Sequence, residues 1–143
     1  MSAGRLTTAL PSRNMKVWSL SATPEAKQLA ITAAIAAADK LATNVVAIDV
    51  SSHLALSDVF VVCSANNERQ LSAIVDNVED ELRKVGQKPL HREGARDGNW
   101  VLLDYPDIVV HVLLAEAREF YRLETLWNDC PVVDIPELVR DPS

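Results

Sequence analysis

The sequence predicts an α/β domain in which a mixed β-sheet is flanked by helices. Capped or striped helical segments alternate with short apolar runs, and two pairs of these runs are joined by short connections. Short connections favour antiparallel pairs, whereas a crossover through a helix places two strands side by side in parallel. The predicted order is helix, strand, strand, helix, short strand, strand, strand, helix.

The first helix is predicted over residues 24–42. Thr23 suits the N-cap, Pro24 the first helical position and Glu25 the first turn. The alanine-rich body of this segment predicts a helix that packs closely on another element.

The second helix carries the clearest pattern in the chain. One apolar stripe recurs at helical spacing and comprises Leu71, Ile74, Val75, Val78, Leu82 and Val85. Asn66 is the predicted N-cap, and Gly86 the predicted C-terminal cap.

Five strands and a last helix complete the predicted domain. The strands are predicted at residues 45–50, 58–64, near 88–91, 99–105 and 107–114. A turn is expected at Asp97-Gly98, and the crossover between residues 58 and 105 predicts a right-handed connection and a parallel pair. The last helix is predicted over 115–129, with a core face formed by Ala117, Phe120, Leu123 and Trp127.

A chain of 143 residues is predicted to form one domain, which occupies residues 24–130. Residues 1–23 are predicted to form a flexible, basic leader without acidic residues, compatible with a disordered extension, a start site upstream of Met15 or an organelle transit peptide. Residues 131–143 form a tail without strong pattern. No apolar run approaches the length of a membrane span, which predicts a soluble protein.

The charge balance argues against direct binding of RNA or DNA. The formal net charge is −6, and from Glu25 onward 20 acidic residues stand against 11 Lys and Arg (14 less Arg5, Arg13 and Lys16), or −9. Neutralising many phosphates requires the opposite sign. A basic protein partner suits this charge better.

Ser57-Asp58 at a strand entry is the sharpest enzymatic candidate. Nucleotidyltransferases hold two Mg²⁺ ions with such a pair and a second carboxylate two residues later. Here that position is Phe60, which offers no oxygen ligand, and no glycine turn precedes Asp58. We therefore interpret Asp58 as an acceptor of nearby backbone N–H groups at the strand entry, as in an Asx-turn. A divergent magnesium-dependent nucleotidyltransferase using Asp58, Asp104 and Asp107 remains the alternative.

The histidines and cysteines predict neither a metal site nor a cofactor. His53, His91 and His111 lack ligand spacing, and His111 is interpreted as a hydrogen-bonded histidine in a sheet face. Cys63 and Cys130 are expected to be reduced, structural thiols of a cytosolic protein. Pairing a cysteine with a histidine as nucleophile and base has no supporting oxyanion turn.

Binding residues are better represented in "GNWVLLDYPD". Trp100, Leu102 and Asp104 alternate on one face of a strand, and Val101, Leu103 and Tyr105 take the other. If one face packs in the core, the other presents an aromatic anchor beside carboxylates, as protein interfaces do. The pattern leaves open which face is which; Glu93 and Asp107 would add charge nearby.

Five motifs together resemble the ribosomal silencing factor family, also called Iojap-related proteins. They are Ser57-Asp58, Asn67-Glu68-Arg69-Gln70, Glu93-Gly94, "GNWVLLDYPDIVVHVL" and "AREFYRLETLW". The resemblance spans about residues 25 to 130. It implies a nucleotidyltransferase-like fold without the enzyme, in agreement with Phe60.

The resemblance also implies a function. The family binds the large ribosomal subunit through universal large-subunit ribosomal protein fourteen, sterically blocks association with the small subunit and represses translation under nutrient limitation. Carried onto this chain, the partner-binding residues are Trp100, Leu102, Leu103, Asp104 and Tyr105. A homodimer when free and a bacterial, cytoplasmic location are further expectations.

Overall fold

The computed structural model describes residues 21–52, 57–94, 98–121 and 129–136, except for the side chains of 119–121. Most of the predicted leader, the end of the tail, His53, Leu123 and Trp127 lie outside the described residues.

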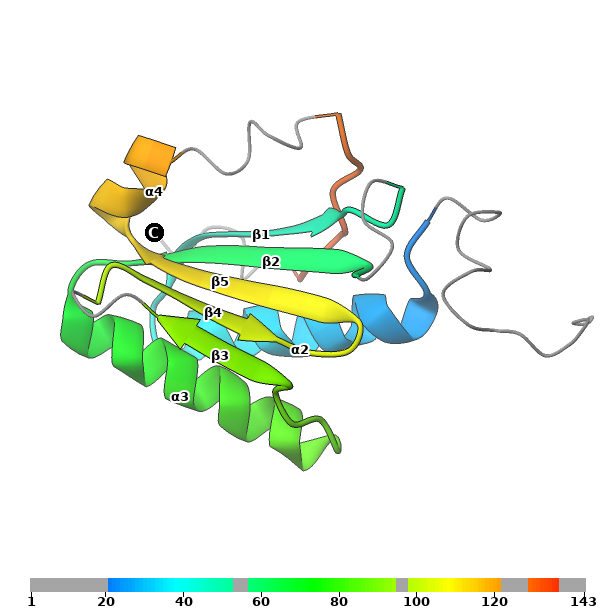
Figure 1. Ribbon diagram of the computed structural model, residues 1–143, viewed down its shortest axis with the longest axis horizontal. Coiled ribbons are helices and arrows are strands. Elements are labelled where there is room, and N and C mark those ends of the chain that lie inside the picture. Colours follow the sequence, from blue (N-terminus) through cyan, green and yellow to red (C-terminus); the bar gives the residue numbers. More distant parts are fainter. Residues whose placement is uncertain (1–20, 53–56, 95–97, 122–128, 137–143) are drawn as a thin grey trace, which may run out of the picture.

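Five strands form one mixed sheet in the spatial order β1-β2-β5-β4-β3 (Figure 1). Their bounds are β1 Thr43–Asp49, β2 Val59–Ala65, β3 His91–Gly94, β4 Trp100–Asp104 and β5 Ile108–Leu114. Both short connections produce antiparallel pairs, β1 with β2 and β4 with β5, and β3 also pairs antiparallel with β4. The predicted mixed α/β sheet is thus confirmed.

The parallel partner of β2 is β5, whereas the sequence predicted the preceding strand, β4, in that place. The crossover was expected to place a strand ending near residue 105 beside β2, but β5 occupies that position and β4 lies outside it. β5 reads IVVHVLL and buries every residue except Leu114, as suits a strand covered on both faces. β4 alternates between buried and half-buried residues, which suits a strand nearer the edge.

Helices α2 (Pro24–Asp39) and α3 (Glu68–Lys84) lie together on one face of the sheet, and α4 (Ala115–Tyr121) follows β5 (Figure 1). Thr23 is the N-cap of α2, as predicted, and its side chain accepts from the N–H of Ala26 at 3.1 Å. The helix ends before the predicted residue 42, because Leu41 adopts a φ of 66° that leaves the helical region.

The caps of α3 differ from the prediction by one position at its start. Asn67, and not Asn66, is the N-cap, and its side chain accepts from the N–H of Gln70 at 2.8 Å. At the other end Val85 is the C-cap and is 54% exposed, so it does not belong to the buried stripe. Gly86 follows with a φ of 87°, the left-handed conformation that commonly ends a helix.

Two segments at the edges of the sheet differ from the sequence prediction. The short strand predicted near 88–91 is β3, which begins at His91. On the opposite edge, part of the patternless tail pairs with β1: the N–H of Asp49 donates to the carbonyl of Pro131, and the N–H of Val133 to that of Ala47, each at 2.8 Å. The tail thus covers the β1 edge, while β3 forms the other edge.

The main core lies between the sheet and the pair α2 and α3. Six alanines of α2 are fully buried there (Ala26, Ala30, Ala33, Ala34, Ala36 and Ala37), and the predicted stripe of α3 contributes Leu71, Ile74, Val75, Val78 and Leu82. The small alanine side chains let α2 approach closely, as its composition predicted. None of the described helices combines the length and the apolar character that a membrane-spanning segment requires.

Candidate partner-binding face of the sheet

Burial decides which face of β4 belongs to the core. Val101, Leu103 and Tyr105 lie in the main core, at 9%, 0% and 1% exposed. Because side chains alternate along a strand, Trp100 and Leu102 point to the opposite face, away from α2 and α3. Both are only half-buried there, and each packs against a smaller cluster on that face.

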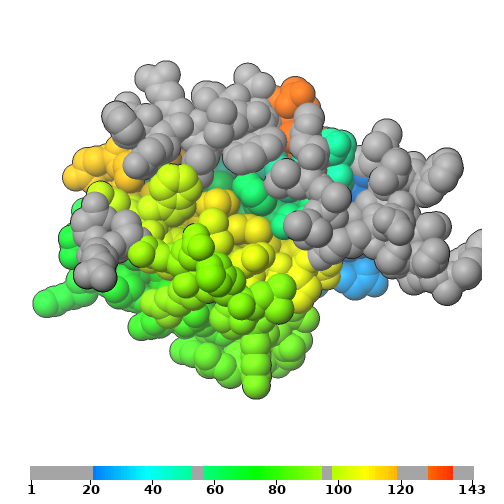
Figure 2. All heavy atoms as spheres, in the orientation of Figure 1, coloured from blue at the N-terminus to red at the C-terminus, as the bar shows by residue number. Residues whose placement is uncertain are grey.

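The strand register identifies the neighbours on this outer face. Leu102 stands opposite Glu93 of β3 on one side and His111 of β5 on the other. Trp100 stands opposite Leu113 of β5. In Figure 2 the atoms of β3 to β5, coloured lime to yellow, form part of the visible surface. An apolar pair is thus bordered by a carboxylate on the edge strand.

A groove of about 680 Å³ adjoins these residues. It is lined by Arg92, Glu93, Gly94, Trp100 and Leu102. The lining therefore combines the indole of Trp100 and the side chain of Leu102 with the carboxylate of Glu93, which stands opposite Leu102 on the same face of the sheet. Such a mixture of apolar anchor and polar rim is typical of protein interfaces.

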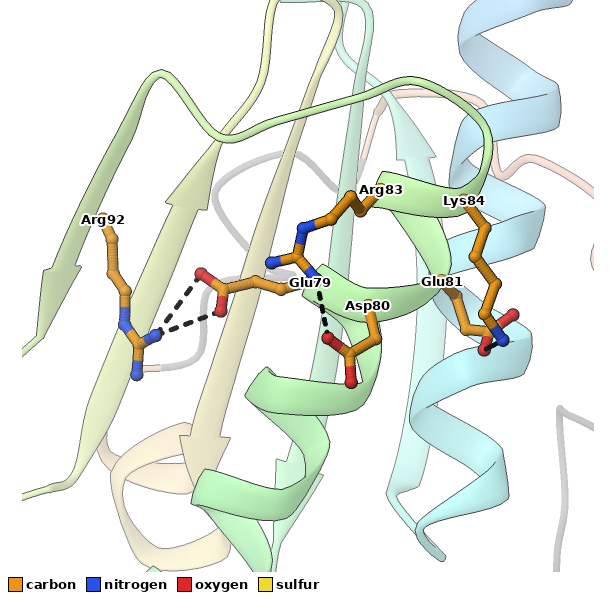
Figure 3. A network of polar contacts seen from close by, with 6 residues as sticks. All are labelled: Glu79, Asp80, Glu81, Arg83, Lys84 and Arg92. Carbon is orange, nitrogen blue, oxygen red and sulfur yellow. Dashed lines mark hydrogen bonds and ion pairs between the residues drawn. The ribbon is translucent and has the colours of Figure 1, made fainter.

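The edge strand is held to α3 by an ion pair. Nη1 of Arg92 lies 3.1 Å from Oε1 of Glu79 and 3.3 Å from Oε2, and Figure 3 shows the Arg92 side chain reaching from β3 toward α3. Glu79 is only 14% exposed and Arg92 49%. On the outer face of β3, Nε2 of His91 lies 2.8 Å from Oε2 of Glu93, with both side chains exposed.

His111 lies buried beneath the outer face. The indole N–H of Trp100 donates to Nδ1 of His111 at 3.2 Å, and the ring of Phe60 lies 4.8 Å from the imidazole between centroids. His111 is 5% exposed, and burial lowers its pKa from 6.5 to about 4. The sequence interpretation of a hydrogen-bonded histidine within a sheet face is confirmed.

The five predicted partner-binding residues are divided by this geometry. Trp100, Leu102 and Asp104 are half-buried on the outer face. Leu103 and Tyr105 are buried in the core, so their side chains are not accessible on this surface. Burial, with the Glu79 carboxylate nearby, raises the pKa of Tyr105 to about 12. The sequence named all five because alternation alone does not say which face is covered.

Asp58, the enzymatic candidate, is engaged in holding the chain. It is fully buried, and its Oδ2 accepts from the N–H of Thr23 at 3.0 Å. Asp58 accepts a backbone N–H, as interpreted, but the donor is Thr23, the N-cap of α2, 35 residues earlier in the chain, and not a nearby residue as in the expected Asx-turn. Phe60 packs with Ile48 and Val109 in a small apolar cluster.

Asp49 has a similar role that sequence reasoning missed. Its Oδ2 accepts from the N–H of Ala22 at 2.9 Å, and its Oδ1 from the hydroxyl of Ser51 at 2.6 Å. The only available signal was an aspartate at the end of an apolar strand. In the described parts of the chain, no three His, Cys, Asp or Glu side chains are grouped so as to hold a metal ion.

Cys63 and His111 lie on opposite faces of the sheet. Cys63 belongs to the main core under the helices, whereas the ring of His111 meets Phe60 and Trp100 on the outer face. Burial raises the pKa of the Cys63 thiol to about 12, which disfavours the thiolate. These two residues therefore do not form a nucleophile and base pair. Both Cys63 and Cys130 are free and buried.

Comparison with known proteins identifies the family. The family described as "Ribosomal silencing factor during starvation" matches residues 23–143. This chain belongs to the ribosomal silencing factor family. The resemblance inferred from the sequence motifs is confirmed.

Curated relatives carry the same family name. A Bacillus subtilis protein named "Ribosomal silencing factor RsfS" is 36% identical over 103 residues, 72% of this chain and 87% of that protein. A Haemophilus influenzae protein of the same name is 34% identical over 85 residues, 59% of this chain and 83% of that protein. "Protein Iojap, chloroplastic" of Zea mays is 28% identical over 115 residues, 78% of this chain and 49% of that protein.

Solved structures of similar proteins have the same fold. A crystal structure of a Chromobacterium violaceum protein has a TM-score of 0.69 at 30% identity, and covers 72% of this chain and 86% of that one. One from Bacillus halodurans has a TM-score of 0.65 at 34% identity, and covers 79% and 100%. The ribosomal silencing factor relatives reported above are named for silencing and not for a reaction.

Proposed function

We propose that this protein is a ribosomal silencing factor that binds universal large-subunit ribosomal protein fourteen on the large ribosomal subunit. Bound there, it sterically blocks association with the small subunit and represses translation under nutrient limitation. Family membership and the relatives' names support this function. The observation that supports a particular binding site is the half-buried pair Trp100 and Leu102, which lines a groove of about 680 Å³.

The proposed contact surface is the outer face of β4 with the adjoining edge strand β3. Trp100 and Leu102 are the apolar anchors. Two carboxylates lie on the same face of the sheet: Asp104, two residues after Leu102 on β4, and Glu93, opposite Leu102 on β3. Leu103 and Tyr105 hold β4 from the core side. Central aromatic and aliphatic anchors with a polar rim supply affinity in protein interfaces.

Charge supports a basic partner. From Glu25 onward the chain carries 20 acidic residues against 11 Lys and Arg, and Glu93 lines the groove. Opposite charge on the partner accelerates association, while apolar anchors prolong residence. Phosphate binding would need the reverse balance. The proposal therefore includes a protein contact and little or no direct contact with nucleic acid.

Three further properties belong to this proposal. The protein acts without catalysis, a proposal supported by the hydrogen bond from the N–H of Thr23 to Asp58 and by Phe60 at the position where a second metal ligand would be needed. It works in the bacterial cytoplasm through the domain predicted at residues 24–130. It forms a homodimer when free, which would cover apolar surface in the absence of the ribosome; sedimentation equilibrium of the purified protein tests this state.

Sedimentation of purified ribosomal subunits with and without the protein tests the function. We expect the protein to co-sediment with the large subunit and to suppress the peak of joined subunits. Purified universal large-subunit ribosomal protein fourteen should compete for the protein and restore joining. If subunits join normally and the protein stays at the top of the gradient, the proposed function is wrong.

A magnesium-dependent labelling assay tests the absence of catalysis. Protein and RNA are incubated with radioactive ATP, and we expect no transfer of label to either. Transfer that requires Asp58 and Mg²⁺ would instead support the nucleotidyltransferase alternative.

A further inference from the structure

His111 lies on the outer face of the sheet but is too buried to contact a partner directly. It lies on β5 directly opposite Leu102 of β4 and Val62 of β2, so it is in the middle of the sheet. At 5% exposed it is almost fully buried and can offer a partner little surface. Its effect on binding would therefore have to pass through a neighbouring residue.

The neighbour is Trp100, which lines the groove. The indole N–H is a donor only, so Nδ1 of His111, 3.2 Å away, must be unprotonated to accept from it. The neutral imidazole then carries its proton on Nε2, which has no hydrogen-bond partner among the described residues. Burial disfavours the charged form, in which Nδ1 would lose its acceptor role.

Ring contacts hold His111 in place for this role. The centroid of Phe60 lies 4.8 Å from the imidazole and that of Trp100 lies 5.9 Å away, each with an interplanar angle of 53°. Both distances are in the range of favourable tilted ring pairs. His111 is thus packed from the β2 side while it accepts from the β4 side.

We propose that His111 is a positioning residue, which fixes the indole of Trp100 at the groove by accepting its N–H. The inference rests on the proposed function. The partner then meets the apolar ring of Trp100, while the polar N–H is already satisfied within the sheet. An indole held in one orientation before binding loses less conformational entropy on binding.

Two variants separate the acceptor from the ring. His111→Phe keeps an aromatic ring but removes the acceptor, whereas His111→Asn keeps an acceptor oxygen near the position of Nδ1. We expect His111→Phe to bind the large subunit about tenfold more weakly. His111→Asn should retain most of the affinity. In a Trp100→Phe background, which lacks the indole N–H, His111→Phe should have little further effect.

The indole N–H signal of Trp100 in a ¹⁵N-edited NMR spectrum reports the hydrogen bond in the free protein. The chain has three tryptophans, so comparison with Trp100→Phe assigns the signal. We expect slow hydrogen exchange in the wild type, faster exchange in His111→Phe and intermediate exchange in His111→Asn. A merely structural role for His111 would not produce this order.

The two readouts distinguish the failure of this inference from that of the proposed function. Fast exchange of the wild-type indole N–H overturns the inference even if His111→Phe does not fold. A folded His111→Phe variant that binds the large subunit as tightly as the wild type also overturns it. If the wild type does not bind the large subunit at all, the proposed function fails, and with it the role of His111 in binding.

Discussion

The carboxylate of Asp58 accepts a hydrogen bond from the backbone N–H of Thr23, 35 residues earlier in the chain, at 3.0 Å. Thr23 is the N-cap of α2, and Asp58 leads into β2. The residue that most resembled a catalytic carboxylate therefore connects the start of a helix to the start of a strand. Asp49 makes an equivalent contact with the N–H of Ala22.

Replacing Asp58 by Ala should destabilise the fold. The variant leaves the part-buried N–H of Thr23 without its acceptor; because the full cost for a buried group is about 1–3 kcal/mol, we expect a loss near the lower end of that range. Urea denaturation of Asp58→Ala, with Asp58→Asn as the variant that keeps an acceptor oxygen, measures the cost. Asp76→Ala removes an exposed carboxylate from α3 and should change the free energy of unfolding by less than about 0.5 kcal/mol. Equal stability of Asp58→Ala and wild type would contradict the structural role.

Replacing Trp100 by Ala should weaken binding to the large subunit. If Trp100 is an interface anchor, truncation costs on the order of 2 kcal/mol or more in affinity. Binding is measured by titration of labelled protein with purified large subunits, after circular dichroism has established that the variant folds. Ile35→Ala is the matched control, because it truncates an apolar residue that is 38% exposed on α2, across the sheet from the proposed contact face. A folded Trp100→Ala variant with unchanged affinity would exclude Trp100 as an anchor.

Replacing Arg92 by Ala should loosen the edge strand more than it destabilises the whole fold. The pair with Glu79 is partly exposed, so its loss should cost no more than about 1 kcal/mol. Hydrogen exchange of the amides of residues 91–94 should nevertheless accelerate, because α3 no longer holds β3 through this side chain. Arg83→Ala is the control, since it removes an exposed pair with Asp80 within α3 (Figure 3). Unchanged exchange in Arg92→Ala would show that backbone pairing with β4 suffices.

Acidification should destabilise the protein partly through His111. Its pKa falls from an ordinary 6.5 to about 4 in the folded protein, so between these values the unfolded chain binds more protons. Stability then rises with pH, and the contribution of His111 is complete above about pH 6.5 and is lost as pH falls toward 4. Urea midpoints at pH 7 and pH 5 should therefore differ less in His111→Phe than in wild type. An equal difference in both proteins would contradict this expectation.

Cys63 should be unreactive in the folded protein. It is fully buried, and burial raises its pKa to about 12, so little thiolate is present at neutral pH. In a Cys130→Ser variant, which leaves Cys63 as the remaining cysteine, iodoacetamide should label the protein only at the rate of unfolding. Labelling rates measured without urea and at increasing urea concentrations show whether labelling follows unfolding. Rapid labelling without urea would show that Cys63 is accessible.

Local sequence patterns predicted the elements because their causes are local. The Thr23-Pro24-Glu25 start of α2 depends on groups within one helical turn, and the side chain of Thr23 caps as expected. The apolar stripe from Leu71 to Leu82 depends only on the helical period, and all five of its residues are buried. Errors appeared where the ends of elements depend on the next segment, as at Asn67 and Leu41.

The candidate site was predicted as a strand but not as a surface. Alternation in "GNWVLLDYPD" separates Trp100 and Leu102 from Leu103 and Tyr105 by face, since side-chain direction reverses at each residue. It contains no information on which face α2 and α3 cover. That depended on the packing of those helices, which buries Leu103 and Tyr105 and leaves the other pair half-buried beside the groove.

By itself the sequence determined the helices, the apolar strands, the acidic charge and the membership of a family, because periodicity, composition and motifs are properties of neighbouring residues. Only the tertiary structure decided that β5 lies between β2 and β4, that Asp58 meets Thr23 and that His111 accepts from Trp100. These contacts join residues far apart in the sequence or on different strands. They form only when the whole sheet and its covering helices pack together, so no local pattern encodes them.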